Sequence, residues 1–404
     1  MQKNRVMITG LGVVSGPGLT TDSFWDALKS GRSAINEFSL PHAETKITRA
    51  SILNGYQPED YFTADELTTL DPFSQYAVIA ASQAIADAGM EKGDKYLKNA
   101  AAIIGSGCGG KQTDEDTYQQ LYKNQRTRAH PLTIPKGMPS AAASMVCSHS
   151  GIKGPSFMIS SACASGSHAI IQGMAMIQAG LVEVALVGAT DAPFTYGLLK
   201  SWEALRVASN DTCRPFCKDR SGLVLGEGAA MLVLESESHA KARNARIYAE
   251  LAGSGMSSDA GHITRPDIDG ICKAISTALI QAGLQPEDVD YINAHGTATM
   301  ANDSSETEAI RRIFKQHADK LAVSSTKSIH GHALGASSAL EVAASVLAIY
   351  HGILPPTVNF TEAAEDCTLD YVPNKARKKD INVALSNSFA FGGLNAVIAL
   401  KKYN

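Results

Sequence analysis

The sequence predicts an α/β fold made of two similar halves, and three observations support this prediction. Short apolar runs typical of buried strands alternate with longer segments of helical periodicity along the chain. The same alternation starts again near residue 245, and no Pro- or Ser-rich linker separates the two parts. We therefore expect an N-terminal half at residues 1–245 and a C-terminal half at residues 246–404, packed closely together.

The N-terminal half shows its elements in a clear order. A first strand is predicted by RVMITGLGVV (5–14), and helices are expected at residues 21–31 and in DPFSQYAVIAASQAIADAG (71–89). Strands follow in AAAIIGSG (100–107), VALVGATDA (184–192) and AMLVLES (230–236). Between them, FMISSACASGSHAIIQGMAMIQAG (157–180) predicts an apolar strand that runs into small residues and then a long helix.

The C-terminal half repeats this pattern. Strands are predicted in ARIYAELAGSG (245–255), VDYINAHG (289–296) and LAVSSTKS (321–328), with a final pair in INVALSNSF (381–389) and NAVIALKKY (395–403). Helices are predicted in GICKAISTALIQAG (270–283), SSETEAIRRIFKQHA (304–318) and ASSALEVAASVLAIYHG (336–352).

Composition excludes several classes of protein. The chain has 404 residues, of which 44% are hydrophobic and 19% charged, as in an ordinary globular protein with a large core. Its 36 basic and 40 acidic residues give a net charge of −4 without like-charge blocks, which argues against nucleic-acid binding through a basic face. Seven irregularly spaced cysteines argue against a disulfide framework, and the N-terminus lacks the apolar region of a signal peptide. We expect a cytoplasmic protein.

One uncharged stretch requires a membrane test. Residues 154–182 contain no acidic residue, lysine or arginine, and they are numerous enough to span a bilayer. They also contain Pro155, His168 and several serines and glutamines, which fit a strand and helix buried inside protein. We therefore expect no membrane segment.

Cys163 is the first candidate for chemistry. It lies where an apolar strand gives way to small residues and a helix start, a position at which the helix dipole and free N–H groups favour a thiolate. The alternative is a buried structural thiol, the usual state of a free cysteine. Cys213 and Cys217 suggest a metal pair, but no second Cys or His pair lies nearby, so we expect no zinc site there.

Two histidines follow predicted strands in glycine-rich loops. His295 lies in YINAHGTATMAND and His332 in SSTKSIHGHALGASS, and strand-end loops are where α/β folds place reactive groups. The alternative is a satisfied core or surface histidine. His330 and His332 also match an HxH metal pair, but no carboxylate or further His at ligand spacing supports a metal. We expect no metal site.

Glu341 lies in a helix of small and apolar residues, so its carboxylate requires a partner. Lys327 is the candidate upstream, and such a pair would fix the position of His332. Two unrelated solvated charges are the alternative. Further along, Phe389 and Phe391 flank the glycine loop of SNSFAFGGLNA (386–396), which suits a backbone oxyanion donor or a moving lid, although a plain β-turn also explains it.

These segments together resemble the β-ketoacyl-acyl-carrier-protein synthases of the thiolase-like superfamily, specifically the type II elongating enzymes. The resemblance covers nearly the whole chain and follows the order of the family's motifs. The motifs are RVMITGLGVVS, SACASGSHAI, CRPFCKDRSGLVLGEGAA, NAHGTATMAND, SSTKSIHGHALGA, LPPTVN, LDYVPN and SNSFAFGGLNA. The resemblance implies a five-layered αβαβα fold and decarboxylative condensation of a Cys-bound acyl chain with malonyl-acyl-carrier protein, which extends the chain by two carbons in fatty-acid elongation.

The resemblance also implies a role for each catalytic position. Cys163 matches the acyl-accepting nucleophile, and His295 and His332 match the pair that promotes decarboxylation and stabilises the enolate. Lys327 and Glu341 match a supporting ion pair. A Cys-His-Asn site would instead suggest the branch that starts chains from coenzyme A thioesters.

The remaining positions concern the substrate. The backbone N–H groups of Cys163 and Phe391 match an oxyanion hole, and Phe391 also matches a gate between the half-reactions. The resemblance implies no cofactor of the chain's own, because phosphopantetheine arrives on the acyl carrier protein. The expected substrate-binding residues are Thr297, Thr299, Thr264, Cys108 and Phe389.

The sequence departs from the family pattern around the site. Cys108 replaces a bulkier aliphatic residue and leaves more room for an acyl chain, while the Cβ of Ala390 restricts positive φ in the loop. The other atypical positions are Ala298, His330, Leu394, Lys136 and Trp202. They suggest a specialised acyl chain.

Three functional hypotheses follow from these observations. The first is a homodimeric fatty-acid condensing enzyme, and the alternative is a ketosynthase subunit of a type II polyketide or polyene synthase that pairs with a chain-length-factor-like partner. A non-catalytic partner subunit would lack the nucleophile, which this chain retains at Cys163.

Overall fold

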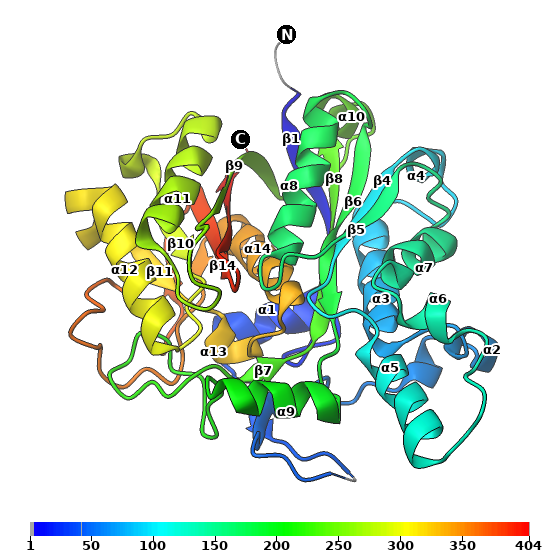
Figure 1. Ribbon diagram of the computed structural model, residues 1–404. Helices are drawn as coiled ribbons and strands as arrows, with labels where there is room; N and C mark the ends of the chain where they lie inside the picture. Colours follow the sequence, from blue (N-terminus) through cyan, green and yellow to red (C-terminus); the bar gives the residue numbers. More distant parts are fainter. Residues whose placement is uncertain (1–3, 42, 404) are drawn as a thin grey trace.

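The computed structural model describes residues 4–41 and 43–403, and its main element is a ten-stranded mixed sheet (Figure 1). The strand order is β11-β10-β14-β15-β9-β1-β8-β6-β4-β5. The bounds in the first half are β1 Val6–Ser15, β4 Ala101–Gly105, β5 Ser156–Ile159, β6 Val184–Asp191 and β8 Gly228–Ser236. Those in the second half are β9 Ala249–Ser258, β10 Tyr291–Asn293, β11 Ala322–Ser324, β14 Val383–Ala390 and β15 Leu394–Lys401.

The two halves of this sheet have the same topology. In the first half the strands lie in the order β5-β4-β6-β8-β1, and in the second in the order β11-β10-β14-β15-β9. When the strands are numbered by their order in the sequence of each half, both halves have the spatial order 3-2-4-5-1. In both, strands 3, 2 and 4 run parallel, and strands 5 and 1 each pair antiparallel with the preceding strand in this order. β1 and β9 pair antiparallel and join the halves.

Helices cover the sheet in three layers, which gives the five-layered αβαβα arrangement that the sequence resemblance implies (Figure 1). One outer layer is formed by α3 (Pro72–Asp87) and α7 (Ala141–Ser150), and the other by α11 (Ile268–Ala282) and α12 (Met300–Phe314). The middle layer consists of α8 (Ser165–Gln178) and α14 (Gly335–His351), which contact each other and strands of both halves.

The middle layer explains the small residues of its helices. A Cβ at Gly166 of α8 would lie 2.7 Å from Ser338 Oγ of α14, and one at Gly105 would lie 2.5 Å from the backbone of Ser165. Every residue of α14 from Gly335 to Ile349 is buried. Tight packing between two helices and two sheet halves therefore selects Gly, Ala and Ser at these positions.

Shorter elements lie around this frame. Strands β2 (Asn36–Glu37), β3 (Arg49–Ser51) and β7 (Leu225–Gly226) form a small sheet, and β12 (Ile353–Leu354) pairs with β13 (Arg377–Lys378). The remaining α-helices are α1 Thr21–Ser30, α2 Ala64–Leu67, α4 Lys95–Lys98, α5 Lys111–Tyr118, α6 Thr133–Gly137, α9 Tyr196–Leu205, α10 Glu237–Ala242 and α13 Lys327–His330. The remaining short turns of helix are η1 Pro58–Asp60, η2 Gln119–Lys123, η3 Pro286–Asp288 and η4 Lys315–Asp319.

The predicted α/β class is confirmed, but several predicted boundaries shift. The strand expected over 245–255 is β9, Ala249–Ser258, and the strand expected over 321–328 ends at Ser324 because α13 begins at Lys327. Helix α12 begins at Met300, four residues before the predicted start at 304, because the extended backbone of Thr299 marks its N-cap. No helix within the described ranges is long and apolar enough to cross a membrane. The division at residue 245 stays a prediction, since the β1–β9 pairing makes the sheet continuous.

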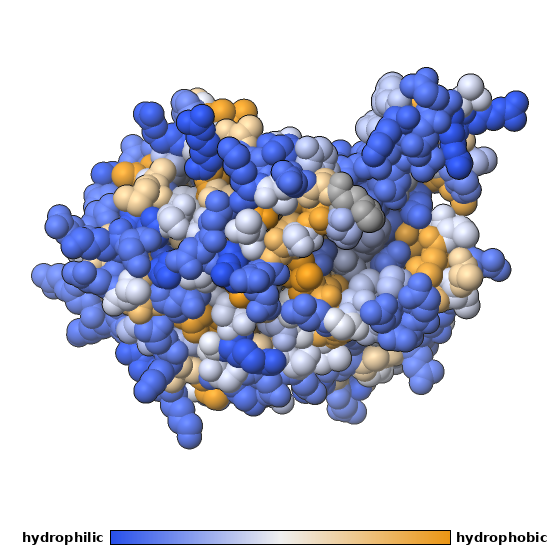
Figure 2. All heavy atoms as spheres, turned by 90° about the horizontal axis from the view of Figure 1, so that it is seen from below, coloured by the Kyte–Doolittle hydropathy of each residue, from blue (hydrophilic) through white to orange (hydrophobic). Residues whose placement is uncertain are grey.

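The molecule is hollowed on the face that carries α9. Figure 2 shows this face, where apolar side chains gather in the middle of a mostly polar surface. Tyr196 and Leu205 of α9 are among the exposed large hydrophobic residues.

Candidate active site

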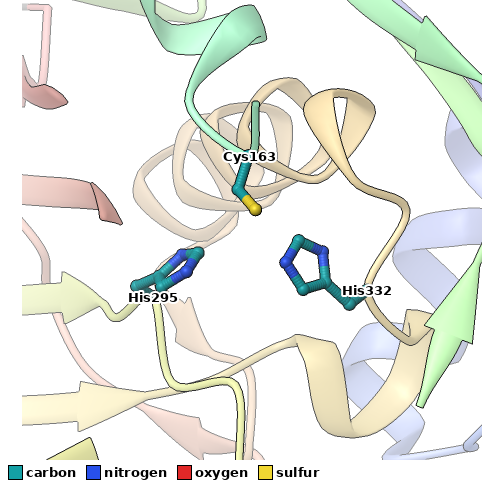
Figure 3. A group of neighbouring side chains, drawn as sticks. All are labelled: Cys163, His295 and His332. Carbon is teal, nitrogen blue, oxygen red and sulfur yellow. The ribbon is translucent and has the colours of Figure 1, made fainter. Parts of the chain in front are cut away.

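Three loops bring Cys163, His295 and His332 together (Figure 3). Cys163 precedes α8, His295 follows β10, and His332 lies between α13 and α14. One ligand atom of each side chain lies within 4.8 Å of the others, and the thiol is directed between the two imidazoles. Residues up to 169 positions apart in sequence thus form one buried cluster.

The Cys163 thiol is held by a strained turn. Ala162 before it has φ of 49°, a conformation that a residue with a Cβ adopts at some cost. Burial raises the pKa of Cys163 to about 11, while Lys327 and a backbone hydrogen bond from Phe391 lower it. Desolvation therefore outweighs the helix-start effect expected from the sequence, and the resting group is a thiol.

His295 is kept as a neutral hydrogen-bond donor. Lys327 Nζ lies 3.3 Å from its Nδ1 and 2.7 Å from its carbonyl oxygen. Because an ammonium can only donate, Nδ1 accepts, and the proton of the neutral ring resides on Nε2. Burial and then the charge of Lys327 hold the pKa of His295 well below its usual value. Nε2–H is therefore available to an anion in the cluster.

His332 is also neutral, but its tautomer is less constrained. Its Nδ1 lies 3.0 Å from Ser337 Oγ, and a hydroxyl can either donate to it or accept from it. Burial and Lys327 hold the pKa of His332 well below its usual value. The two imidazole rings lie edge to face, 5.7 Å apart at an interplanar angle of 88°. His332 can therefore accept or donate a proton at Nε2.

The expected Lys327–Glu341 pair is present and wholly buried. Burial raises the pKa of Glu341 to about 7, and the charge of Lys327 acts in the opposite direction. Glu341 Oε2 has no hydrogen-bond partner among the described residues. The carboxylate holds Lys327 where the ammonium reaches His295.

Glu306 is a site residue that sequence reasoning missed. Its carboxylate accepts the backbone N–H of His295 at 2.9 Å and of Gly296 at 2.8 Å, and Asn387 Nδ2 at 3.1 Å. It lies in α12 and therefore holds the His295 loop against that helix. Nothing in SSETEAIRR distinguishes this acid from its neighbours, so only the contacts reveal it.

The cluster has the wrong outer contacts for a metal. A metal-bound imidazole usually donates its second N–H to an acceptor, whereas His295 receives a hydrogen bond from Lys327 at that position. Within the described ranges, Cys163, His295 and His332 form the only Cys/His/Asp/Glu group at ligand distance. His330 lies outside it and contacts Thr326 Oγ1 at 3.0 Å. The arrangement favours anion stabilisation.

Two cavities meet at Cys163. The first contains the expected substrate residues Thr264, Thr297, Thr299 and Phe389. Thr297 and Thr299 hydroxyls lie 2.8 Å apart. The second, of about 240 Å³, is largely apolar and is lined by Gly107, Cys108, Ala162, Leu198, Leu205 and Leu334 among others. The first cavity therefore suits a polar arm and the second an acyl chain.

Phe391 and Trp202 line both cavities. Their rings stack with centroids 6.1 Å apart, and this pair forms a wall between the two spaces. After Ala390 the loop turns at Gly392 and Gly393, with φ of 83° and 70°, conformations that suit glycine. Ala390 itself ends β14 without positive φ, so its Cβ causes no strain. Gly392 N–H donates to Ile263 O at 2.7 Å.

Some atypical positions lie elsewhere. Ala298, which is buried, has φ of 65° between the two threonines. Lys136 is in a separate hollow with Arg126 and Arg128, and Nζ lies 3.4 Å from Leu67 O. The structure thus gathers all the sequence-predicted site residues around Cys163 and leaves Lys136 outside.

Family models match most of the chain. The N-terminal domain of beta-ketoacyl synthase matches residues 3–240, and the C-terminal domain of beta-ketoacyl synthase matches residues 248–361. "Nodulation protein E" of Rhizobium sp. (strain N33) is 48% identical over 400 residues, 98% of this chain and 99% of that protein. "3-Oxoacyl-[acyl-carrier-protein] synthase 2" of Coxiella burnetii (strain RSA 493 / Nine Mile phase I) is 41% identical over 411 residues, 100% of this chain and 99% of that protein.

A solved structure agrees with these matches. "The ishigamide ketosynthase/chain length factor" superposes with a TM-score of 0.95 at 34% identity, and the match covers 100% of both chains.

Proposed function

The chain belongs to the beta-ketoacyl synthase family, and on that premise we propose that Cys163, His295 and His332 carry out its condensation reaction. The enzyme is a 3-oxoacyl-acyl-carrier-protein synthase, which joins an acyl chain to malonyl-acyl-carrier protein with loss of carbon dioxide in fatty-acid elongation. The observation that carries the residue assignment is the buried thiol between two neutral imidazoles, one of which is held as a donor by Lys327.

The first half-reaction is acyl transfer. Cys163 Sγ attacks the thioester carbonyl of acyl-carrier protein, and the developing oxyanion accepts the backbone N–H groups of Cys163 and Phe391. Because the resting thiol is protonated, its proton passes to a neutral imidazole, for which His332 Nε2 is the suitable acceptor. The proton then leaves with the pantetheine thiol.

The second half-reaction is decarboxylation and condensation. Loss of carbon dioxide from the malonyl thioester leaves an enolate, whose oxygen accepts Nε2–H from His295. It also accepts Nε2–H from His332 in the tautomer whose Nδ1 accepts from Ser337 Oγ. The enolate carbon attacks the acyl carbonyl on Cys163, and the tetrahedral intermediate collapses to the 3-oxoacyl product and a thiolate. The thiolate then takes up a proton from solvent, which restores the resting thiol. No strong base is required, which agrees with two imidazoles of lowered pKa.

The substrate arm and partners follow from the two cavities. Phosphopantetheine, delivered on the carrier protein, would lie in the first cavity against the hydroxyls of Thr264, Thr297 and Thr299, while the acyl chain occupies the apolar cavity past Cys108. Phe391 would separate the two half-reactions by moving with its glycine loop. The partners are the acyl carrier protein and either a second copy of the chain or a chain-length-factor-like subunit.

The heterodimeric alternative has a specific observation in its favour. The chain superposes at a TM-score of 0.95 on a protein described as a ketosynthase/chain length factor. In that alternative the chain remains the condensing subunit, since it retains the thiol and both histidines.

Mass analysis of carrier-bound products tests the proposal. The purified chain alone receives an acyl-carrier protein and malonyl-carrier protein, and a 3-oxo product longer by two carbons is expected. Cys163→Ala should form no acyl-enzyme, whereas Cys147→Ala, which removes a cysteine outside both cavities, should behave as wild type. Persistent acylation of the Cys163→Ala protein refutes the nucleophile. An extended product that appears only with an added partner subunit supports the heterodimer.

A further inference from the structure

β6 ends in a buried carboxylate that the reaction above does not use. Asp191 accepts Ser106 Oγ at 2.7 Å, Gly107 N at 2.9 Å, and both the backbone N and the thiol of Cys108 at 3.1 Å. It also accepts Gly335 N, the first residue of α14, at 2.7 Å. One side chain therefore joins the loop after β4 to the start of the central helix of the other half.

The repeated topology gives this position a counterpart. β6 and β14 are the fourth strands of their halves. β14 is followed by Phe391, whose backbone hydrogen-bonds to Cys163 before α8, while β6 ends in Asp191 before α14. The helix starts also match, since Ala162 and Leu334 both have φ of 49°. The loop after β14 thus contacts the reactive thiol, whereas the equivalent position at the end of β6 carries the Asp191 carboxylate.

The surroundings of Asp191 suit an anion. α14 presents its N-terminus, where free N–H groups and the helix dipole favour negative charge. Burial raises the pKa of Asp191, and the hydrogen bonds from Ser106, Gly107 and Cys108 lower it. An amide in its place would present its own N–H₂ to these donors, so at least one of them would lose its acceptor.

Both segments that Asp191 joins are walls of the proposed site. Gly107, Cys108 and Leu334 line the apolar cavity beside Cys163. Leu334 directly precedes Gly335, and Ser337 in the first turn of α14 holds the ring of His332. A shift of this turn would therefore move His332 and the cavity wall together.

We propose that Asp191 is a positioning residue that clamps the loop at residues 106–108 to the first turn of α14 and so sets both the acyl-cavity wall and the placement of His332. This inference rests on the proposed condensation activity. It assigns to the Cys108 thiol a second role, since the hydrogen bond to Asp191 fixes the side chain that borders the acyl chain.

Asp191→Asn tests the proposal in the full-length protein. Asp87→Asn is the matched control, because the Asp87 carboxylate also accepts a backbone N–H, that of Leu11. Neither Asp87 nor Leu11 lines the two cavities. Acylation of Cys163 and reaction of the acylated enzyme with malonyl-carrier protein are measured separately. In the Asp191 variant we expect condensation slower by about 100-fold, the size expected for a catalytic group misplaced by about 1 Å. Acylation should slow less, because loss of the Asp191 charge eases deprotonation of Cys163 and partly offsets the displacement of His332.

The pH profile of Cys163 alkylation by iodoacetamide gives a second readout. Burial raises the pKa of this thiol, Lys327 lowers it, and the charges of Asp191 and Glu341 add smaller increases. The facing imidazoles of His295 and His332 remain neutral. Loss of the Asp191 charge should therefore move the profile to lower pH. Two results overturn the proposal. One is a loss of thermal stability with normal condensation and an unchanged pH profile of alkylation. The other is an equal fall in the rates of both half-reactions, again with an unchanged pH profile.

A second pair of variants applies if Asp191→Asn does not fold. Ser106→Ala removes the hydroxyl that donates to Asp191 at 2.7 Å, and the control Ser144→Ala removes a hydroxyl of α7 that donates to Ala141 O. Neither serine lines the two cavities. The Ser106 variant should slow condensation more than acylation, while Ser144→Ala should leave both half-reactions at wild-type rates. Equal behaviour of the two variants refutes the clamp. Absence of any condensation by the wild-type protein would instead refute the proposed function.

Discussion

Replacement of Lys327 by methionine should separate the stability of the site from its chemistry. The side chain is fully buried and contacts Glu341, the carbonyl oxygen of His295 and its Nδ1. Its loss leaves the Glu341 carboxylate without its cation, and breaking such a buried pair costs about 3–5 kcal/mol of unfolding free energy. Nδ1 of His295 also loses its donor, so the ring is no longer held with the proton on Nε2.

The stability loss should depend on pH. Burial already raises the pKa of Glu341 to about 7, and without the Lys327 charge the pKa rises further. A carboxyl whose folded-state pKa lies above its unfolded value adds stability at low pH that is lost as pH rises through the folded pKa. The penalty of Lys327→Met should therefore be smaller at about pH 6 than at about pH 8.

The double variant Lys327→Met with Glu341→Gln provides the control. Removal of both charges should return the unfolding free energy to within about 2 kcal/mol of wild type. Condensation by the acylated enzyme should nevertheless stay slower by about 100-fold, because the donor to His295 is still absent. Urea unfolding followed by circular dichroism gives the stability, and single-turnover mass analysis gives the rate. A double variant that regains the full condensation rate would refute the role assigned to Lys327.

Three further predictions concern individual side chains. Since the pKa values of His295 and His332 lie well below the ordinary value, single-turnover condensation should be flat between about pH 6 and 8; a tenfold rise per pH unit near pH 6.5 would contradict neutral imidazoles. Cys108→Ile should fill part of the apolar cavity of about 240 Å³ and shift carrier-bound products to shorter chains in mass analysis, and an unchanged length range would show that the acyl chain lies elsewhere. Burial raises the pKa of Glu227 to about 7. The unfolding free energy of wild type relative to Glu227→Gln should therefore be highest below about pH 4.5 and fall by up to about 3 kcal/mol as the pH rises to 7. A difference between the two proteins that stays constant over that pH range would exclude this titration.

Much of the fold was predictable because strand and helix periodicity are local properties. The apolar runs at β1, β6 and β14 and the small-residue helices α8 and α14 are visible in the sequence. The shared strand order of the two halves is not, since no tandem repeat marks it and the order depends on contacts between distant segments.

The candidate site likewise contains residues that the sequence indicates and residues that only the folded structure reveals. Cys163, His295 and His332 stand out because each lies beside small residues and glycines at a strand or helix end. Glu306 and Asp191 look like ordinary acids in the sequence, and only their buried hydrogen bonds distinguish them. The protonated state of the thiol was also hidden, because desolvation depends on the whole fold around it.

The end of β6 contacts the start of α14, and the loop after β14 contacts the turn before α8, so each half contributes to the central helix of the other. This exchange bears on how the molecule folds. The turn before α8 is completed by a backbone group from the second half, and the turn before α14 by a carboxylate from the first. In each half, the turn before the central helix needs a hydrogen-bonding group from the other half. The two halves should therefore order each other as they fold. Separately expressed fragments split near residue 245 should therefore remain incompletely ordered until mixed, and the thiol should become slow to alkylate only when both are present.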